Sequence, residues 1–319
     1  MKYILLCAFL LLASVAYTQK NYDTLVNITN ITIPTNTGNL YGSLTVPNLK
    51  NKMPVALIIA GSGPTDKNGN SGKVLFANSY KILADSLLKY GIATLRYDKR
   101  GAGESALSII DPLTFRFNNY VTDAVDCIKL LQVDKRFSQV IVIGHSEGSL
   151  VGMIAARITN ANKYISLAGA GYPIQDVLRK QFKAQPEAYQ NMLLTRLDTL
   201  ITGKLLTNVP KELMGIFNPA TQPYLIDWFT YNPAKEIAKL TIPTLIVNGT
   251  TDIQVGVEEA EHLHKASKKS TLAIISGMNH LLKDAPVDRM LILATYTNAP
   301  NAPINSLLVG YIVKYIRAK

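Results

Sequence analysis

The amino-acid sequence predicts an α/β fold: a doubly wound, mostly parallel β-sheet with helices on both faces and a helical cap insertion. Short apolar runs recur along the 319 residues, and such runs are typical of strands buried on both faces. Amphipathic stretches separate them, an alternation that is typical of parallel sheets. One long interval breaks the alternation, which indicates the insertion. The length suits one large domain with an insertion.

Residues 1–18 have the composition of a secretory signal peptide. Lys2 precedes an apolar core from about Tyr3 to Val15, and small residues follow. An apolar core of about 13 residues is short for a membrane span. We expect cleavage near residues 16–18, a secreted or periplasmic protein, and no membrane span in the mature chain. The alternative is an uncleaved anchor.

The strands are expected in chain order as follows. Residues 26–33 and 40–46 are rich in β-branched residues and flank the turn-forming sequence PTNTGN, so they predict a hairpin at one sheet edge. Six continuous apolar runs predict buried strands, at residues 55–60, 93–98, 139–144, 164–169, 243–249 and 271–276.

Helices are expected where apolar residues recur at spacings of three and four. These stretches are residues 76–90, 122–133, 257–267 and 304–316. A mostly apolar stretch after residue 146 is expected to form a further, buried helix. Residues 172–239 carry helical patterns without a strand signal, and we expect them to form a cap after the sixth strand. The main domain, built on the sheet, would then comprise residues 19–171 and 240–319.

Cysteine and charge exclude other classes. Once the signal is removed Cys127 stands alone, so an internal disulfide is impossible, and its helical pattern favours a small buried apolar group over a nucleophile. The formal net charge is +11, but the basic residues are scattered and no basic run is interleaved with aromatics. Nucleic-acid binding is therefore not expected.

The sequence GHSEG, residues 144–148, fits the G-x-S-x-G pattern of a sharp strand-to-helix turn. The expected strand before it and apolar helix after it are the context that the pattern requires. Glycines at both ends would let the strand and helix approach closely. We therefore expect Ser146 to be a nucleophile beyond the carboxyl edge of the sheet; the alternative is an incidental serine in a glycine-rich turn.

A serine nucleophile needs a base and an acid that orients the base. His280 follows the last strand at the carboxyl edge, whereas His145 is expected to point elsewhere and His262 and His264 to be solvated. Asp252 follows the strand at 243–249, which gives the chain order Ser, Asp, His. The alternatives are a turn-forming role for Asp252, and Asp284 or Asp227 as the acid.

An oxyanion also needs hydrogen-bond donors. One is expected to be the backbone N–H of Glu147, the residue after the nucleophile. The other is expected in the loop AGSGPTDKNGN after the strand at 55–60, with the N–H of Ser62 preferred and that of Gly63 next. A plain turn is the alternative interpretation of this loop.

Taken in order, the segments AGSGP, YDKRGAGES, GHSEG, GTTDIQV and GMNH resemble the α/β-hydrolase superfamily, and the resemblance covers most of the mature chain. The loop GSGPTDKNGN together with GHSEG is similar to the branch of bacterial carboxylesterases labelled serine aminopeptidase-like. The resemblance implies ester hydrolysis without a metal or organic cofactor, and it assigns Ser146, Asp252 and His280 as a triad. The chain departs from many relatives at Ala60, where a histidine often stands. The segment YDKRGAGES is expected to be a structural turn that holds Asp98 and Arg100 near the site; direct substrate contact is the alternative.

Three functions are compatible with these motifs. The first is a secreted serine carboxylesterase acting on small, short-chain acyl esters through an acyl-enzyme. The second is a serine aminopeptidase, which needs acidic residues to anchor an amine. The third is a non-catalytic binding protein on the same scaffold. The insertion should supply the substrate pocket, although most of its methionines and aromatic residues are expected to be core.

Overall fold

The computed structural model describes residues 26–318 except 73–74, 109–110 and 299–301. The expected signal peptide at residues 1–18 lies outside the described residues. Eight strands form one sheet in the order β1-β2-β6-β3-β7-β8-β9-β10. Their bounds are β1 Val26–Thr35, β2 Gly38–Pro47, β3 Met53–Ile59, β6 Ala93–Tyr97, β7 Phe137–His145, β8 Lys163–Leu167, β9 Thr244–Gly249 and β10 Ser270–Ile275. Two short strands, β4 Asn70–Ser71 and β5 Leu75–Phe76, pair separately.

The sheet is parallel except at one edge. β1 pairs with β2 and β2 with β6 in antiparallel register, and every other pairing in the sheet is parallel. The hairpin that the sequence predicts at a sheet edge is therefore confirmed, as are the positions of the six predicted strands to within two residues at each end; β10, at the other edge of the sheet, is only partly buried. The carboxyl ends of the parallel strands meet at one rim, where crevices for ligands form in such sheets.

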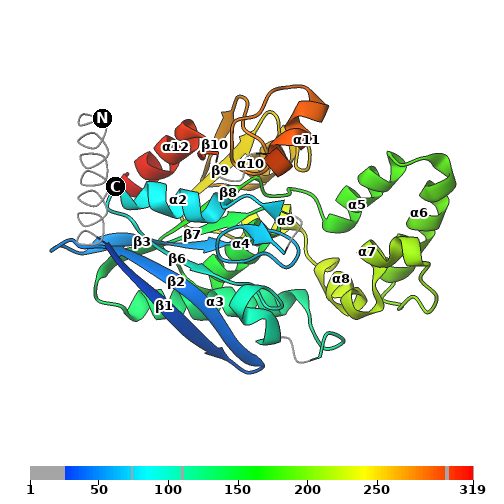
Figure 1. Cartoon of the computed structure of the whole chain (residues 1–319), viewed down its shortest axis with the longest axis horizontal. Helices are drawn as coiled ribbons and strands as arrows, with labels where there is room; N and C mark the ends of the chain where they lie inside the picture. Colours follow the sequence, from blue (N-terminus) through cyan, green and yellow to red (C-terminus); the bar gives the residue numbers. More distant parts are fainter. Residues whose placement is uncertain (1–25, 73–74, 109–110, 299–301, 319) are drawn as a thin grey trace, which may run out of the picture.

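Helices cover both faces of the sheet (Figure 1). Side chains alternate along each strand: in β3, Val55 and Leu57 pack on one face, whereas Ala56 and Ile58 pack on the other. The first face is covered by α3 Phe117–Val133, α4 Glu147–Thr159 and α10 Val257–Ala266. The opposite face is covered by α2 Ser79–Leu88 and α12 Ser306–Arg317. Cys127 is fully buried in α3, as its pattern predicts.

Two helix boundaries differ from the sequence prediction. The helix expected from residue 76 begins at Ser79, because Phe76 belongs to β5 and Asn78 adopts a left-handed backbone with φ 52°. The helix expected from residue 122 begins at Phe117, where the Asn119 side chain accepts a hydrogen bond from the N–H of Arg116. A further helix, α11 Arg289–Asn298, and a 3₁₀ turn, η1 Gly103–Ser108, were not expected from the sequence.

The inserted helices, α5 to α9, lie between β8 and β9 (Figure 1). They extend beyond the carboxyl rim of the sheet and share an apolar cluster of their own that includes Phe182, Leu197 and Phe217. Trp228 packs instead with the core beneath α3. Their bounds are α5 Ile174–Lys183, α6 Glu187–Ile201, α7 Met214–Phe217, α8 Gln222–Trp228 and α9 Pro233–Ile237, with 3₁₀ turns at Lys211–Leu213 and Pro219–Thr221.

In the part of the chain that the structure describes, no helix combines the length and apolar character needed to cross a bilayer.

Candidate active site

Ser146 occupies the turn between β7 and α4 in a strained backbone conformation. Its φ is 54° and its ψ is −122°, a region that non-glycine residues rarely adopt. The backbone N–H of Ser146 donates to the carbonyl of Leu167 at the end of β8, which fixes the turn to the neighbouring strand. The strain is typical of a nucleophile elbow, in which the serine side chain projects from the sheet rim.

The glycines of GHSEG are required by close backbone approach. A Cβ atom on Gly144 would lie 2.2 Å from the carbonyl oxygen of Gly148. A Cβ atom on Gly148 would lie 2.5 Å from the carbonyl oxygens of both Ile59 and Ala60 in and after β3. Real Cβ atoms do not tolerate such contacts, so the elbow can form against β3 only without side chains at these positions.

His280 and Asp252 are hydrogen-bonded to each other. The Nδ1 of His280 lies 2.7 Å from Oδ2 of Asp252, and both residues are buried. The other carboxylate oxygen of Asp252 accepts the backbone N–H groups of Gln254 and Val255 at 2.8 and 2.9 Å. The carboxylate is therefore fixed on both sides, and the bond to Nδ1 leaves Nε2 of the imidazole for proton transfer.

The loops that carry this pair are packed closely against one another. A Cβ atom on Gly249, at the end of β9, would lie 1.8 Å from the carbonyl oxygen of Met278. The N–H of Thr251 donates to that same carbonyl at 3.2 Å. Asn279 accepts the N–H groups of Leu281 and Lys283 with its side-chain oxygen, so the backbone around His280 is held by local hydrogen bonds.

Ser146 and His280 line the same cavity, although their side chains are not joined by a hydrogen bond. Among the described residues the Ser146 hydroxyl makes no hydrogen bond. Catalytic hydrogen bonds are often long before a substrate binds. The sequence-predicted serine and histidine are thus brought to one cavity, and the aspartate to the histidine.

The other histidines and acids have different partners. The side chain of Asp284 binds that of Asn305 at 2.5 Å, and Asp227 accepts the backbone N–H of Asn118 at 3.0 Å, so neither is hydrogen-bonded to the histidine of the pair. His262 and His264, which were expected to be solvated, are only partly exposed: the His262 ring stacks on Tyr172 with centroids 4.1 Å apart, and His264 bonds the Ser270 hydroxyl. Both residues lie in the C-terminal half of α10.

The loop after β3 brings Ser62 beside the elbow. A Cβ atom on Gly61 would lie 3.0 Å from the Cβ of Ser146, so these backbones are in close contact. Ser62, Ser146 and Glu147 line one cavity. Within the described residues, the backbone N–H groups of Ser62 and Glu147 donate to no protein acceptor. Two free donors beside a serine hydroxyl are the arrangement that an oxyanion requires.

His145 bridges two loops, a role that the sequence did not indicate. The Tyr80 hydroxyl accepts the N–H of Gly61 at 3.0 Å and bonds Nδ1 of His145 at 2.8 Å. The Nε2 of His145 then donates to the carbonyl of His280 at 2.9 Å. Burial, with a smaller contribution from the neighbouring His280, lowers the pKa of His145 to about 3, so its ring is neutral. This chain of bonds connects the loop of Ser62 to the loop of His280.

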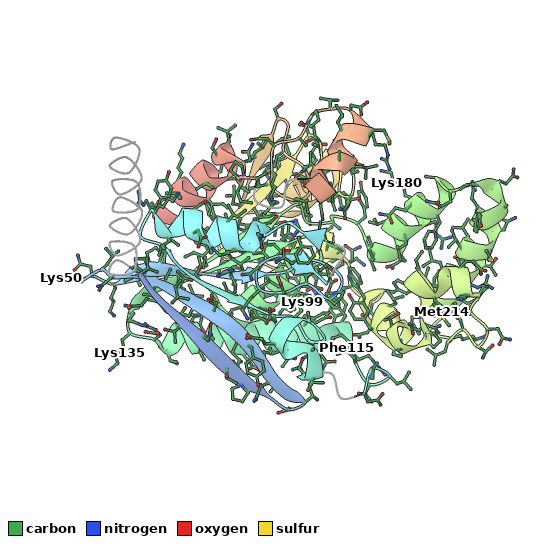
Figure 2. The ribbon with its side chains drawn as sticks, viewed as in Figure 1. Lys50, Lys99, Phe115, Lys135, Lys180 and Met214 are labelled. Carbon is green, nitrogen blue, oxygen red and sulfur yellow. The ribbon has the colours of Figure 1, made fainter. Side chains whose placement is uncertain are left out.

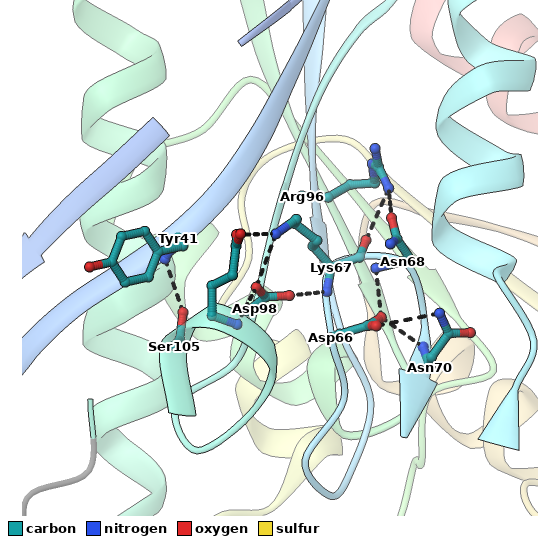
Figure 3. Close-up of polar contacts among 9 residues, drawn as sticks. Tyr41, Asp66, Lys67, Asn68, Asn70, Arg96, Asp98 and Ser105 are labelled. Atoms are coloured by element: carbon teal, nitrogen blue, oxygen red, sulfur yellow. Dashed lines mark hydrogen bonds and ion pairs between the residues drawn. The ribbon is translucent and has the colours of Figure 1, made fainter. Parts of the chain in front are cut away.

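The segment YDKRGAGES forms a buried polar turn after β6, as expected. Asp98 accepts the backbone N–H groups of Lys67 and Glu104 and the Lys67 ammonium (Figure 3). Arg100 makes a bidentate ion pair with Asp123 of α3, at 2.6 and 2.7 Å. The Asp98 bonds hold the loop after β3 against the end of β6, and the Arg100 ion pair holds the turn against α3. A substrate contact for either residue is not needed to explain them.

Two cavities meet at Ser146. The cap-side cavity has a volume of about 270 Å³ and lies between the elbow and α5 and α8; its apolar wall includes Ile174, Val177, Leu178, Leu225 and Trp228. The His280-side cavity has a volume of about 130 Å³ and is more polar; its lining includes His280, Thr65, Leu75 and Ser79. Ser62 and Ser146 line both cavities.

Within the described residues, no group of three or more histidine, cysteine, aspartate and glutamate side chains is placed to hold a metal ion.

Comparison with known proteins gives a family match. The family model described as serine aminopeptidase, S33, matches residues 71–235, just over half of the chain. Esterase EstD of Thermotoga maritima is 28% identical over 260 residues, which cover 79% of this chain and 61% of EstD. The aligned part of this chain therefore spans less than two thirds of that relative.

Solved structures share the fold. Est1E from Butyrivibrio proteoclasticus with bound ferulic acid superposes with a TM-score of 0.58 at 20% identity, covering 90% of this chain and 100% of Est1E. Mouse alpha/beta hydrolase domain-containing protein 10 gives a TM-score of 0.56 at 17% identity, covering 91% of this chain and 98% of the mouse chain. At these identities the likeness shows the α/β-hydrolase fold, as the sequence predicts.

Proposed function

The chain belongs to the serine aminopeptidase S33 family of α/β hydrolases, and we propose that it is a secreted serine hydrolase that cleaves carboxylic esters. The observation that carries the proposal is the position of Ser146. It lies on a strained elbow between two cavities, one of which is also lined by a histidine hydrogen-bonded to a buried aspartate. The similarity to an esterase of Thermotoga maritima supports the same chemistry.

In the proposed reaction the oxygen of Ser146 attacks the ester carbonyl carbon and His280 takes the hydroxyl proton at Nε2. Asp252 holds the ring and stabilises the imidazolium. The N–H groups of Ser62 and Glu147 bind the oxyanion. The intermediate collapses as His280 gives its proton to the departing alcohol, leaving an acyl-enzyme on Ser146. Water, deprotonated by the same histidine, then releases the carboxylic acid.

The position of His280 indicates which cavity would take the alcohol and which the acyl group of the ester. Because this histidine must give a proton to the leaving oxygen, the alcohol belongs on its side of the serine. The His280-side cavity of about 130 Å³ would therefore take a small alcohol. The larger apolar cap-side cavity, about 270 Å³, would take the acyl group. This volume is below the usual range for drug-sized ligands, which favours short acyl chains.

Aminopeptidase activity is the second candidate, and Glu147 is the observation in its favour. This residue supplies the one carboxylate in the described lining of the two cavities. Its Oε2 atom has no partner at hydrogen-bonding geometry, although burial and the charge of this carboxylate raise the pKa of nearby Tyr224 well above its ordinary value. An amine would have to compete with the Lys99 ammonium, 3.3 Å from Oε1 of Glu147, so we favour esters.

Replacing Ser146 by alanine tests the proposal. We expect Ser146→Ala to lower turnover of p-nitrophenyl butyrate by at least about 10⁴-fold, because the attacking oxygen is lost. Ser86→Ala, which removes a hydroxyl on α2 that bonds only the helix backbone, is the control and should keep wild-type turnover. Retention of activity by the Ser146 variant would contradict the assignment.

Two further measurements separate the alternatives. Faster cleavage of aminoacyl nitroanilides than of acyl nitrophenyl esters would favour the peptidase. A wild-type protein that a fluorophosphonate probe does not label would favour the non-catalytic binding protein.

The proposal that the protein is secreted rests on the composition of residues 1–18. Mass spectrometry of the exported protein tests it by identifying the N-terminal residue.

A further inference from the structure

Lys99 is buried in the interior of the molecule, two residues after the end of β6. The whole residue is 2% exposed. Figure 2 shows it in the interior, whereas Lys50 and Lys135 point outward from the edge of the molecule. A fully buried lysine is rare because moving an ammonium group out of water is costly. Such a residue therefore needs partners that compensate its charge.

All three N–H bonds of the Lys99 ammonium have a partner. One donates to the carbonyl oxygen of Gly61 at 2.9 Å, and a second to Oε1 of Glu147 at 3.3 Å. The third direction is occupied by the ring of Tyr120, whose centroid lies 4.0 Å from Nζ. Burial lowers the pKa of Lys99, and the Glu147 carboxylate opposes that shift.

Two of these partners are linked directly to the two N–H groups expected to bind an oxyanion. The carbonyl of Gly61 and the N–H of Ser62 are parts of one planar peptide unit and point in opposite directions. Fixing the carbonyl therefore fixes the direction of the Ser62 N–H. The other amide of Gly61 is held as well, because its N–H donates to the Tyr80 hydroxyl. The ammonium also bonds the side chain of Glu147, whose backbone supplies the second free N–H.

Stability alone does not account for this arrangement. A buried ion pair is often no more stabilising than apolar side chains of similar volume, because desolvation offsets the attraction. The ammonium instead makes a charge-assisted bond to a carbonyl, which polarises the whole peptide unit and increases the positive charge at its N–H. The polarised N–H binds a substrate oxygen more strongly when negative charge develops on that oxygen in the transition state.

We propose that Lys99 is a positioning residue for the oxyanion site, which orients and polarises the Gly61–Ser62 peptide and holds Glu147 beside it. The inference rests on the proposed ester hydrolysis. Lys99 touches neither the substrate nor the triad in this arrangement. It acts on the transition state through the Ser62 N–H, so its effect belongs in kcat and not in KM.

The test compares two variants that differ at Lys99 alone. Lys99→Met by itself would leave the Glu147 carboxylate buried without its cation, so the reference is Glu147→Gln and the test variant is Lys99→Met/Glu147→Gln. We expect kcat for p-nitrophenyl butyrate to fall about 10- to 100-fold from reference to test variant, with KM within about threefold, because a misaligned donor costs somewhat less than a deleted one.

A transition-state analogue gives the second readout. An aryl trifluoromethyl ketone adds to a serine hydroxyl and forms a stable oxyanion. Its inhibition constant should rise by the same factor as kcat falls, whereas a merely structural defect would not couple the two. Lys163→Met is the matched control: this lysine donates to the carbonyls of Tyr315 and Ile316 at the opposite rim of the sheet, and its loss should leave kcat unchanged.

A folded test variant with the kcat and inhibition constant of the reference would overturn the proposal, as would a loss confined to KM. If the methionine variant does not fold, Lys99→Gln/Glu147→Gln gives the same comparison with a polar side chain. Failure of the proposed function would appear differently, as a wild-type protein without esterase activity or a Ser146→Ala variant that retains it.

Discussion

His145 connects, through single hydrogen bonds, two loops that are far apart in the sequence. The ring lies between the Tyr80 hydroxyl and the carbonyl of His280, and both ring nitrogens are used. Its nitrogens must therefore carry one proton in total, with the hydrogen on Nε2. Protonating Nδ1 would remove the acceptor for the tyrosine hydroxyl and place a charge beside the His280 ring, 4.8 Å away between centroids.

The neutral state of His145 predicts a dependence of stability on pH. Its pKa is about 3 in the folded protein and about 6.5 when unfolded, so between these values the unfolded chain binds the extra proton. The contribution of neutral His145 to the free energy of unfolding is therefore fully present above pH 6.5. It is lost as the pH falls below that value, by about 1.4 kcal/mol per pH unit. Between pH 7 and pH 5, the wild type should lose about 2 kcal/mol more unfolding free energy than His145→Gln in urea titrations. Equal losses in the two proteins would contradict the prediction.

The sequence pointed to the residues of the proposed triad more readily than to the residues that hold them. Ser146, Asp252 and His280 each follow a recognisable strand, and parallel strands bring such positions to one rim. Tyr80 and Lys99 gave no comparable signal, because their roles depend on side chains that cross the interior to reach Gly61. For Lys99 the available signal was a cation directly after a buried strand and an aspartate.

At the scale of secondary structure, the start of α4 is determined by backbone contact with β3. The apolar pattern predicted both the strand and the helix, and the GHSEG pattern predicted the turn between them. The pattern did not give the distances that make the glycines necessary. Conversely, α11 was missed because its apolar residues are not arranged on one face, and Met290 and Leu291 are both exposed.

Two glycine substitutions in helices should therefore have opposite effects. Gly148→Ala would place a methyl group 2.5 Å from backbone oxygens that cannot move independently, and we expect it to destabilise the protein by about 3 kcal/mol or more. Gly310→Ala, on the exposed face of α12 with no atom within 4 Å of the added methyl group, should stabilise it by about 0.5–1 kcal/mol. Urea unfolding of both variants measures these changes in the free energy of unfolding. A Gly148→Ala protein as stable as the wild type would show that the elbow can move away from β3.

At the scale of the whole molecule, one part of the fold positions the proposed catalytic residues and another part forms the wall of the cap-side cavity. The sheet and the helices on its two faces position Ser146 and the loops of Asp252 and His280, whereas the inserted helices supply much of the cap-side wall. The sheet was predictable because each buried strand carries its own apolar run. The arrangement of the inserted helices was not, since short helices packed around Phe182 and Phe217 leave no periodic pattern that fixes their packing. The division into domains at residues 172 and 239 stays a prediction.

The assignment of the two cavities predicts separable effects on the two halves of an ester. Leu178→Trp adds bulk to the cap-side cavity, and Leu75→Trp adds bulk to the His280-side cavity. If the acyl group lies under α5, the first change should lower the kcat/KM ratio of p-nitrophenyl octanoate to acetate by about tenfold or more, because a few methylene groups lose their space. The second change should leave that ratio unaltered and instead lower the kcat/KM ratio of benzyl butyrate to methyl butyrate by a similar factor.

Each variant is the control for the other, since both add the same side chain beside the same serine. The opposite pattern would place the acyl group on the side of His280. The histidine would then have to protonate the leaving oxygen from the far side of Ser146. The hydrogen bond between its Nδ1 and Asp252 makes that geometry unfavourable.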